Sequence, residues 1–245
     1  RLIGIPARVN ALAGLGFGFS SGRLFARLLR PFLLRLFKTV LNDKRSLLIL
    51  QNDDDFAMLT TKAGLELDRV RVIRGAGVNL NEYLPSPLPS GVPTVMLASR
   101  MLWDKGVGEF VKAAGIILSQ GVEARFVLVG KPDVENPSSI TVGQLHKWRD
   151  SGAVEWWGHK ENMPEVLSQA TVICLPSYYG EGVPKVLLEA MACARPIITT
   201  NTPGCRDLAG SGQSQSGLLV NASDVNDLVC AIKTLLAAPS HCKNL

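Results

Sequence analysis

The sequence predicts an α/β fold in which one complete, doubly wound parallel sheet is joined to part of a second α/β domain. From residue 93 onward, short apolar runs alternate with helical runs of about ten to fifteen residues, a pattern typical of parallel strands connected by helices. A proline-rich stretch at 85–92 is typical of a linker between domains. Residues 1–84 hold only about three strand-like runs, too few for a complete doubly wound domain.

We therefore expect three parts in the chain. Residues 1–84 form the C-terminal part of one domain, 85–92 form the linker, and 93–245 form a complete domain. The chain begins with arginine rather than methionine, so we also expect it to be a piece of a longer protein.

The first part opens with a strand near 8–13 that runs into the glycines Gly14, Gly16 and Gly18. These glycines do not form a dinucleotide fingerprint, because they alternate with apolar residues and no acidic residue follows about 20 positions later. A flexible loop and a loop on the acceptor side of a site are both open interpretations. Further strands are predicted at 46–50 and 69–73, and a helix with acidic residues in its first turn at 53–62.

The segment 22–40 combines an apolar stripe with arginines at helical spacing. This combination is typical of a helix that lies at an anionic membrane surface. The alternative is a pair of helices that covers a sheet and keeps its basic face in water. Because proline interrupts helical hydrogen bonding, Pro31 predicts two helices or a kink. The apolar face consists of Phe25, Leu28, Leu29, Phe32, Leu33, Leu36 and Val40, and the basic face of Arg23, Arg27, Arg30 and Lys38.

Positive charge is confined to the start of the chain. Residues 1–45 contain seven arginines, two lysines and one aspartate, which gives a net charge of +8. Because the whole chain carries +5, the remaining residues carry −3. A general nucleic-acid-binding role is therefore not favoured, since it would need basic residues over the whole binding surface.

The five cysteines are an odd number without close pairing, and no Cys/His cluster has zinc-site spacing. We expect them to be buried, reduced thiols of a cytoplasmic protein. They are Cys174, Cys193, Cys205, Cys230 and Cys242.

The second part alternates regularly between strands and helices. Ligands of such sheets bind at the carboxyl ends of the strands, near the point where the strand order reverses. The predicted strands lie near 93–98, 124–129, 153–156, 171–175, 195–200 and 217–220, and the predicted helices near 107–119, 141–150, 162–169, 184–194, 203–209 and 223–237.

One strand–turn–helix stretch, 171–194, carries the strongest functional signal. After the strand, the chain turns through Gly180 and Gly182 and enters a helix at Pro184. The free N–H groups of the first helical turn favour an anion. Glu181 in the turn and Glu189 in the helix could accept hydrogen bonds from sugar hydroxyls. The alternative is an amphipathic helix with two solvated glutamates.

Two cations follow the strand at 93–98. Arg100 and Lys105 flank a short loop that enters the next helix. Fixed cations at this edge could neutralise a nucleotide diphosphate without a metal ion. The alternative for either cation alone is a surface ion pair.

The pattern of Glu181, seven residues, Glu189 and then Ala190-Met191-Ala192 resembles the signature of the retaining nucleotide-sugar glycosyltransferases of family four, which have the GT-B fold. The resemblance implies that the first glutamate contacts the donor sugar and the second the ribose. It also implies that residues 93–245 bind the donor and that the chain lacks the start of the first domain and part of the C-terminal end. It implies diphosphate contacts from Arg100 and Lys105, further donor contacts from Gly180, Gly182, Val183 and Lys185, and a border to the base from Gly158 and His159.

Other interpretations stay open for some of these residues. His159 would equally fit a surface position, and Trp156 and Trp157 fit core packing better than base stacking. No Asp-x-Asp follows an apolar strand, and Asp53 to Asp55 instead open a helix, so we expect no metal site and no cofactor besides the UDP-sugar substrate.

The stretches 132–139 and 175–189 look similar to bacterial enzymes that add N-acetylhexosamines to lipid-linked surface glycans. The resemblance implies transfer of a sugar from a UDP-sugar to a lipid-linked acceptor, with retention of anomeric configuration. It further implies a cytoplasmic enzyme, peripheral at the inner face of the membrane, in polysaccharide biosynthesis. A nucleotide-sugar-binding fragment without turnover and an unrelated Rossmann-type nucleotide-binding domain are the alternatives.

Overall fold

The computed structural model describes residues 6–15, 19, 24–210 and 216–237. The chain divides into two compact units that do not follow a single cut in the sequence. The first unit comprises Arg1–Gly77, Tyr179–Pro184 and Thr202–Cys205, and the second comprises Val78–Tyr178, Lys185–Asn201 and Arg206–Leu245.

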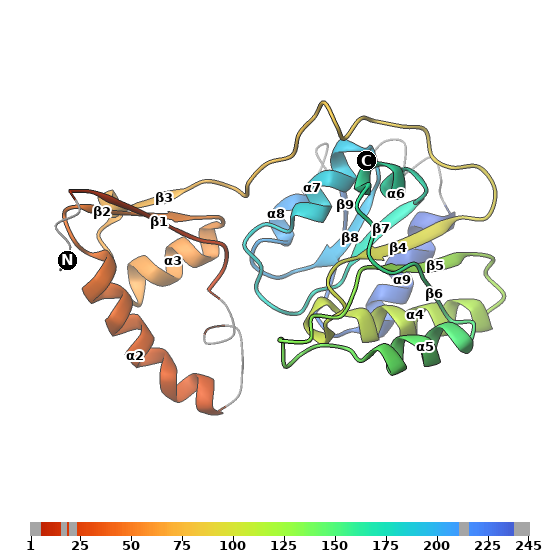
Figure 1. The fold of residues 1–245 in the computed structure, drawn as a ribbon, viewed down its shortest axis with the longest axis horizontal. Helices are drawn as coiled ribbons and strands as arrows, with labels where there is room; N and C mark the ends of the chain where they lie inside the picture. The colour runs from red at the N-terminus through yellow and green to blue at the C-terminus, as the bar shows by residue number, and fades with distance from the viewer. Residues whose placement is uncertain (1–5, 16–18, 20–23, 211–215, 238–245) are drawn as a thin grey trace. The chain divides into compact units, whose positions relative to one another are not determined.

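The second unit contains a six-stranded parallel sheet with the order β6-β5-β4-β7-β8-β9 (Figure 1). The alternation of strands and helices therefore predicted the doubly wound sheet correctly. The strands are β4 (Thr94–Ala98), β5 (Arg125–Val129), β6 (Glu155–Trp156), β7 (Val172–Leu175), β8 (Ile197–Thr200) and β9 (Gly217–Val220). The helical elements are η2 (Trp103–Lys105), α4 (Val107–Ser119), α5 (Val142–Asp150), α6 (Met163–Ser168), α7 (Lys185–Ala192), α8 (Arg206–Ala209) and α9 (Val225–Ala237).

Both faces of the central strands β4 and β7 are buried, which explains why these strands are mostly apolar. Side chains alternate along each strand, so Val95 and Leu97 of β4 pack in one cluster with α4, α5 and α9. Met96 and Ala98 pack in the other cluster with α6 and α7. The sheet is thus the middle of three layers (Figure 1).

The strand order reverses at β4. The chain first adds β5 and β6 on one side of β4, and then returns to place β7, β8 and β9 on the other side. The connections after β4 and β7 leave in opposite directions, which opens a crevice at their carboxyl ends. This is the position at which an open α/β sheet binds ligands.

The first unit has a parallel three-stranded sheet with the order β1-β2-β3. Its core is formed by Leu48 and Leu50 of the central strand with Leu41, Leu59 and Val70. Asn52 caps α3 by accepting a hydrogen bond from Asp55 N at 2.8 Å, so the predicted helix with an acidic first turn is confirmed. The elements are β1 (Arg8–Leu12), α2 (Leu24–Leu41), β2 (Ser46–Leu50), α3 (Asp53–Thr61), η1 (Leu67–Arg69) and β3 (Val70–Val72).

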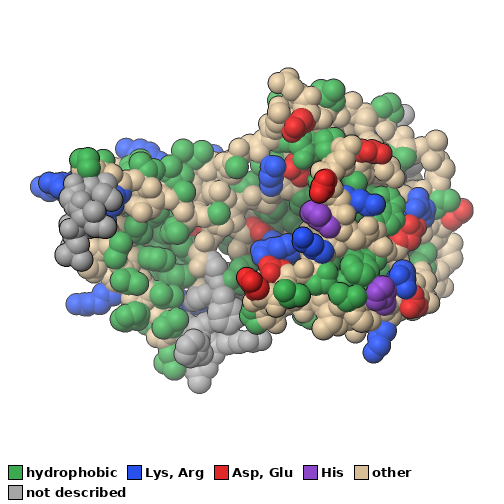
Figure 2. Space-filling view, in the orientation of Figure 1, with side chains coloured by type: hydrophobic (Ala, Val, Ile, Leu, Met, Phe, Trp, Pro, Cys, Tyr) green, Lys and Arg blue, Asp and Glu red, His purple; other side chains and the backbone are tan. Residues whose placement is uncertain are grey.

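Helix α2 differs from the sequence prediction in two ways. It is one helix that continues through Pro31, so of the two expected outcomes, two helices or a kink, the first was wrong. It also packs on the core of the first unit through Leu34, Phe37 and Leu41. The predicted apolar face is mostly solvent-exposed instead, with Leu28 71% and Phe32 65% exposed. Hydrophobic side chains accordingly gather over α2 in Figure 2.

Two further facts bear on the membrane prediction. Within the described part of the chain, no helix combines the length and the hydropathy that crossing a bilayer requires. The Arg30 guanidinium donates a hydrogen bond to Phe19 O at 2.8 Å, so this member of the predicted basic face has a local partner. The side chains of Arg23, Phe25 and Arg27 lie outside the described structure, as do Gly16 and Gly18.

The segment from Val78 to Pro93 belongs to the second unit, so the division falls after Gly77 rather than after residue 84. Tyr83 is buried in the second unit's core, and Ser86 N donates to Cys193 O. Proline-rich composition indicates a lack of regular secondary structure, but it does not indicate which domain the segment packs on.

Four of the cysteines lie in the described residues, and three of them are buried. These three, as predicted, are Cys174, Cys193 and Cys205. Cys230 is exposed, because it lies on the solvent side of α9 rather than among its buried residues, and its predicted burial was wrong. Cys242 lies beyond the described residues.

Candidate functional site

The loops after β4 and β7 pack against each other at the crevice of the second unit. Gly106 has a φ of +73°, and a Cβ at this position would lie 2.2 Å from Pro176 O. Ser177 Oγ donates to Asp104 O at 3.1 Å, and Tyr178 N donates to the same oxygen at 3.2 Å. Glycine at position 106 therefore allows α4 to begin directly beside the end of β7.

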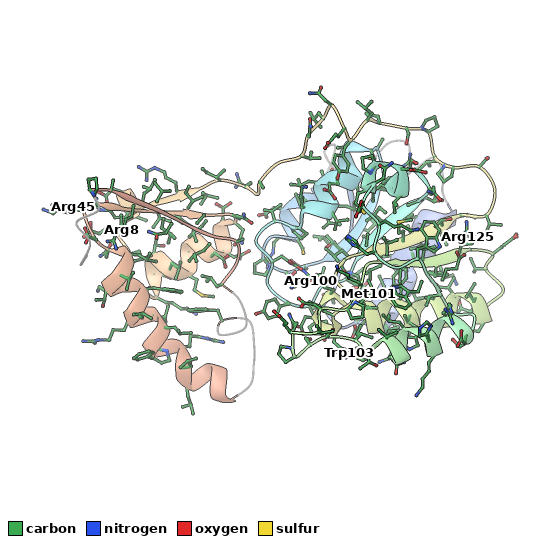
Figure 3. All side chains as sticks on the ribbon, in the orientation of Figure 1. Arg8, Arg45, Arg100, Met101, Trp103 and Arg125 are labelled. Atoms are coloured by element: carbon green, nitrogen blue, oxygen red, sulfur yellow. The ribbon has the colours of Figure 1, made fainter. Side chains whose placement is uncertain are left out.

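Arg100 lies in the loop that leaves β4, as the sequence predicted, together with Met101 and Trp103 (Figure 3). Its Nη1 forms a 2.6 Å ion pair with Oδ2 of Asp133, which follows β5. The Arg100 side chain is 59% exposed, and an exposed pair of this kind stabilises the fold by about 1 kcal/mol or less. An anion in the crevice could therefore compete for the guanidinium at small cost.

Lys105 is the last residue of η2 and directly precedes Gly106. The loop that carries both cations is fixed by backbone hydrogen bonds to the loop after β5. Met101 N donates to Lys131 O at 3.0 Å, and Trp103 N donates to Ser138 O at 2.9 Å. The two predicted diphosphate ligands thus lie on a well-anchored loop at the carboxyl end of β4.

Glu189 is buried within α7, so the interpretation of this residue as a solvated helix glutamate was wrong. Its Oε1 accepts a hydrogen bond from Tyr83 Oη at 2.8 Å and lies 3.1 Å from Lys185 Nζ. The sequence placed Lys185 and Glu189 one helical turn apart, and the structure brings them into contact. Burial and the hydrogen bond to Glu189 raise the pKa of Tyr83 above its usual range, so the phenol remains a donor.

The turn with Gly180, Glu181, Gly182 and Val183 belongs to the first unit by its contacts. Asn52 Nδ2 donates to Glu181 O at 3.3 Å and to Gly182 O at 3.4 Å. Gln51 Oε1 accepts from Val183 N at 3.0 Å, and a Cβ at position 182 would lie 2.0 Å from that oxygen. The predicted donor-contacting turn is therefore held by side chains that immediately follow β2.

Gly14 packs in the first unit against this same turn, since a Cβ at Gly14 would lie 3.0 Å from Gly182 N. This contact places the first glycine of the stretch beside the turn, and it does not separate a flexible loop from a loop on the acceptor side.

The loop after β6 supplies the remaining predicted residues. Gly158 O accepts a hydrogen bond from Gly130 N at 2.7 Å, and His159 is exposed. Trp156 packs against the cluster of α4, α5 and α9, whereas Trp157 packs against the opposite cluster. Core packing, as favoured from the sequence, is therefore the role of both tryptophans in this structure.

The electrostatics of the crevice keep Tyr178 neutral. Burial raises its pKa to about 12, and the nearby negative charges of Glu109 and Asp104 add to the shift.

Across the described ranges, no three His, Cys, Asp or Glu side chains gather in a way that could hold a metal ion.

Residues 92–238 match the sequence model of the family described as glycosyl transferases group 1, and this match covers more than half of the chain. The chain belongs to this family. A relative from Campylobacter jejuni, named N,N'-diacetylbacillosaminyl-diphospho-undecaprenol alpha-1,3-N-acetylgalactosaminyltransferase, is 30% identical over 95% of this chain and 62% of its own length. The alpha-maltose-1-phosphate synthase of Mycolicibacterium smegmatis is 30% identical over 76% of this chain and 52% of its own.

Solved structures share the fold. The Anabaena protein Alr3699/HepE in complex with UDP matches 97% of this chain and 66% of its own with a TM-score of 0.77 and 21% identity. Sucrose-phosphate synthase from Thermosynechococcus elongatus matches 95% of this chain and 59% of its own with a TM-score of 0.76 and 24% identity. The GT-B-like fold expected from the sequence is thereby confirmed. The chain spans about half to three-fifths of the length of the curated relatives it matches.

Two side chains that contact predicted site residues were not predicted from the sequence, Tyr83 beside Glu189 and Asp133 beside Arg100. Tyr83 lies just before a stretch assigned to the linker, and its aromatic ring was the only signal there. Asp133 follows the end of β5, and its position at a strand end was the signal that it faces the same edge as Arg100.

Proposed function

We propose that this chain is part of a retaining glycosyltransferase that transfers a sugar, an N-acetylhexosamine, from a UDP-sugar to a lipid-linked saccharide. The observation that carries the proposal is the pair Arg100 and Lys105 on an anchored loop at the carboxyl end of β4, where the strand order of the sheet reverses. The bound UDP of a structural neighbour and the diphospho-undecaprenol in a relative's name support the nucleotide and the lipid-linked acceptor.

In the proposed reaction, the bond between the anomeric carbon and the diphosphate oxygen breaks, and the acceptor oxygen bonds to the same face of that carbon. Negative charge grows on the leaving UDP, so fixed cations stabilise the transition state more than the ground state. Arg100 and Lys105 supply the positive charge that stabilises the leaving UDP. Glu181 contacts the donor sugar, and Glu189 contacts the ribose. The acceptor proton passes to the leaving phosphate, so the products are the glycoside and UDP.

The remaining donor contacts in the proposal come from the turn before α7, from α7 itself and from the loop after β6. The backbones of Gly180, Gly182 and Val183 would border the sugar and phosphate, and Gly158 and His159 would border the base. Lys185 would add a charge one turn from Glu189.

Binding and turnover test the proposal in sequence. We expect UDP and UDP-N-acetylhexosamines to raise the melting temperature of the chain, because only a ligand of the native state does so, whereas NAD should not. A single-turnover assay with a lipid-linked saccharide then measures transfer. Binding without transfer would identify a donor-binding fragment, and preference for NAD over UDP would refute the proposal.

The two glutamates are expected to differ in their effect on binding. Glu189→Ala should weaken binding of UDP itself, because the proposed contact is to the ribose. Glu181→Ala should retain UDP affinity and lose the difference in affinity between UDP-sugar and UDP, because its contact is to the sugar. Calorimetric titration of both ligands measures these effects, and a reversed pattern would show that the two roles are exchanged.

Donor binding is expected to need no divalent metal ion. Arg100 and Lys105 supply positive charge at the proposed diphosphate position, where a metal would otherwise neutralise the phosphates. UDP affinity measured with excess EDTA should equal that measured with magnesium or manganese. A loss of binding in EDTA that either metal restores would contradict the assignment.

We also expect the first unit to dock on anionic membranes at the cytoplasmic face. Leu28, Phe32 and Val40 form an exposed apolar surface on α2, and residues 1–45 carry a net charge of +8. Each basic residue near an anionic surface contributes about 1 kcal/mol. The chain should sediment with anionic vesicles and be released by salt, which screens charges beyond about 10 Å at 0.1 M.

The control for membrane docking is charge reversal. Arg23→Glu, Arg27→Glu and Arg35→Glu together should abolish sedimentation, and Arg30 is spared because it bonds Phe19 O. Equal sedimentation with neutral vesicles, unaffected by these substitutions, would instead indicate nonspecific adhesion of the apolar surface.

A further inference from the structure

The segment 83–87, which we name the strap, lies along α7 and its C-terminal turn within the second unit. Tyr83 Oη donates to Glu189 Oε1 at 2.8 Å, near the middle of the helix. Ser86 N donates to Cys193 O, and Arg195 Nη2 donates to Ser86 O and Pro87 O, both at 2.8 Å. The strap is thus attached to α7 and to the turn that follows it at three successive points.

At the C-terminal end of the strap, the contact is with Arg195, whose backbone is fixed by the turn that ends α7. After α7, Ala194 N donates to Met191 O and Arg195 N donates to Ala190 O, which closes the helix in a Schellman turn with Ala194 at a φ of 57°. The turn directs Arg195 inward, where it is buried without a carboxylate in hydrogen-bonding contact and uses the strap's carbonyl oxygens instead. Nε and Nη1 of Arg195 are buried without a hydrogen-bond partner, so breaking the Nη2 contacts would remove the hydrogen bonds that this buried cation makes to the strap, which is costly.

The near end of the strap controls one oxygen of Glu189. Both Tyr83 and Lys185 approach Oε1, although a carboxylate has acceptor positions on each of its two oxygens. Lys185 is 64% exposed and flexible, so it cannot fix the carboxylate plane. Tyr83 is 7% exposed and has a rigid ring, so its hydroxyl can.

We propose that Tyr83 is a positioning residue for the nucleotide: its hydroxyl anchors Oε1 of Glu189 and thereby orients Oε2 toward the ribose hydroxyls. This inference rests on the proposed function, in which Glu189 contacts the ribose. In this proposal Tyr83 acts on the nucleotide through Glu189, without contacting it. Because the raised pKa of Tyr83 keeps the phenol protonated, the anchor holds over the neutral and moderately alkaline range.

The test compares UDP with 2′,3′-dideoxy-UDP, which lacks both ribose hydroxyls, by calorimetry. Tyr83→Phe should weaken UDP binding about five- to tenfold, within the range for the net loss of one typical hydrogen bond. It should leave the affinity for the dideoxy nucleotide unchanged. In a Glu189→Ala background, Tyr83→Phe should cause no further loss with either ligand, because the two residues act as one unit.

Ser86→Ala is the matched control within the strap. It removes the hydroxyl that contacts Arg195 and retains both carbonyl contacts, so it should lower the melting temperature slightly and leave the UDP preference over the dideoxy nucleotide intact. Equal losses for both nucleotides in Tyr83→Phe, or no loss for either, would overturn the positioning role. A wild-type chain that binds neither nucleotide would instead overturn the proposed function, and the inference with it.

Discussion

Arg100→Ala and Lys105→Ala are each expected to weaken UDP binding by about 1–3 kcal/mol, a range that covers both typical hydrogen bonds and those to charged groups. Both cations lie on the loop after β4, and backbone bonds to the loop after β5 hold that loop in place. The diphosphate would replace Asp133 as the partner of Arg100, so most of the guanidinium's attraction becomes available for binding. Calorimetry at low and high salt measures the loss. Salt should weaken UDP binding by the wild type more than UDP binding by a variant that carries both substitutions.

Arg125→Ala provides the control for this prediction. Arg125 is also a surface arginine bonded to a carboxylate, Glu155, but it begins β5 and lies at the opposite end of the sheet from Arg100 (Figure 3). Its removal should leave UDP affinity unchanged. Wild-type UDP affinity in both Arg100→Ala and Lys105→Ala would show that the diphosphate does not bind at this strand end.

Gly106→Ala is expected to destabilise the second unit by about 2–4 kcal/mol. The left-handed backbone conformation at φ +73° costs a non-glycine residue about 1–2 kcal/mol. The new Cβ would also lie 2.2 Å from Pro176 O, a backbone atom that cannot rotate away. The loops after β4 and β7 would have to separate, so UDP affinity should fall together with the free energy of unfolding measured in urea.

Gly121→Ala separates the two causes. Gly121 has nearly the same φ, +75°, but a Cβ there would meet no atom within 4 Å. Its substitution should therefore cost only the conformational part, and it should not affect UDP binding. Equal destabilisation by Gly106→Ala and Gly121→Ala would mean that the contact with Pro176 is relieved without cost, contrary to the tight packing that we describe.

The sequence alone determined the elements of the second unit and the strand ends that carry its polar residues. Helical and strand periodicities are local properties, so a β4–α4 or β5–α5 pair is visible without knowledge of its neighbours. Because parallel strands place their carboxyl ends at one edge, the sequence also located Arg100, Lys105 and Gly158 at that edge. The contact between Lys185 and Glu189 was equally predictable, since both lie on one helix.

Only the tertiary structure decided contacts between residues that are far apart in sequence. Tyr83 meets Glu189 across 106 positions, and Arg100 meets Asp133 across 33. The sequence of α2 offers two apolar faces, and the position of β2 selects the one with Leu34 and Phe37. In the same way, contacts with Gln51 and Asn52 assign the Glu181 turn to the first unit. Such choices depend on which surfaces meet in space, and periodicity in a single segment carries no information about its partner.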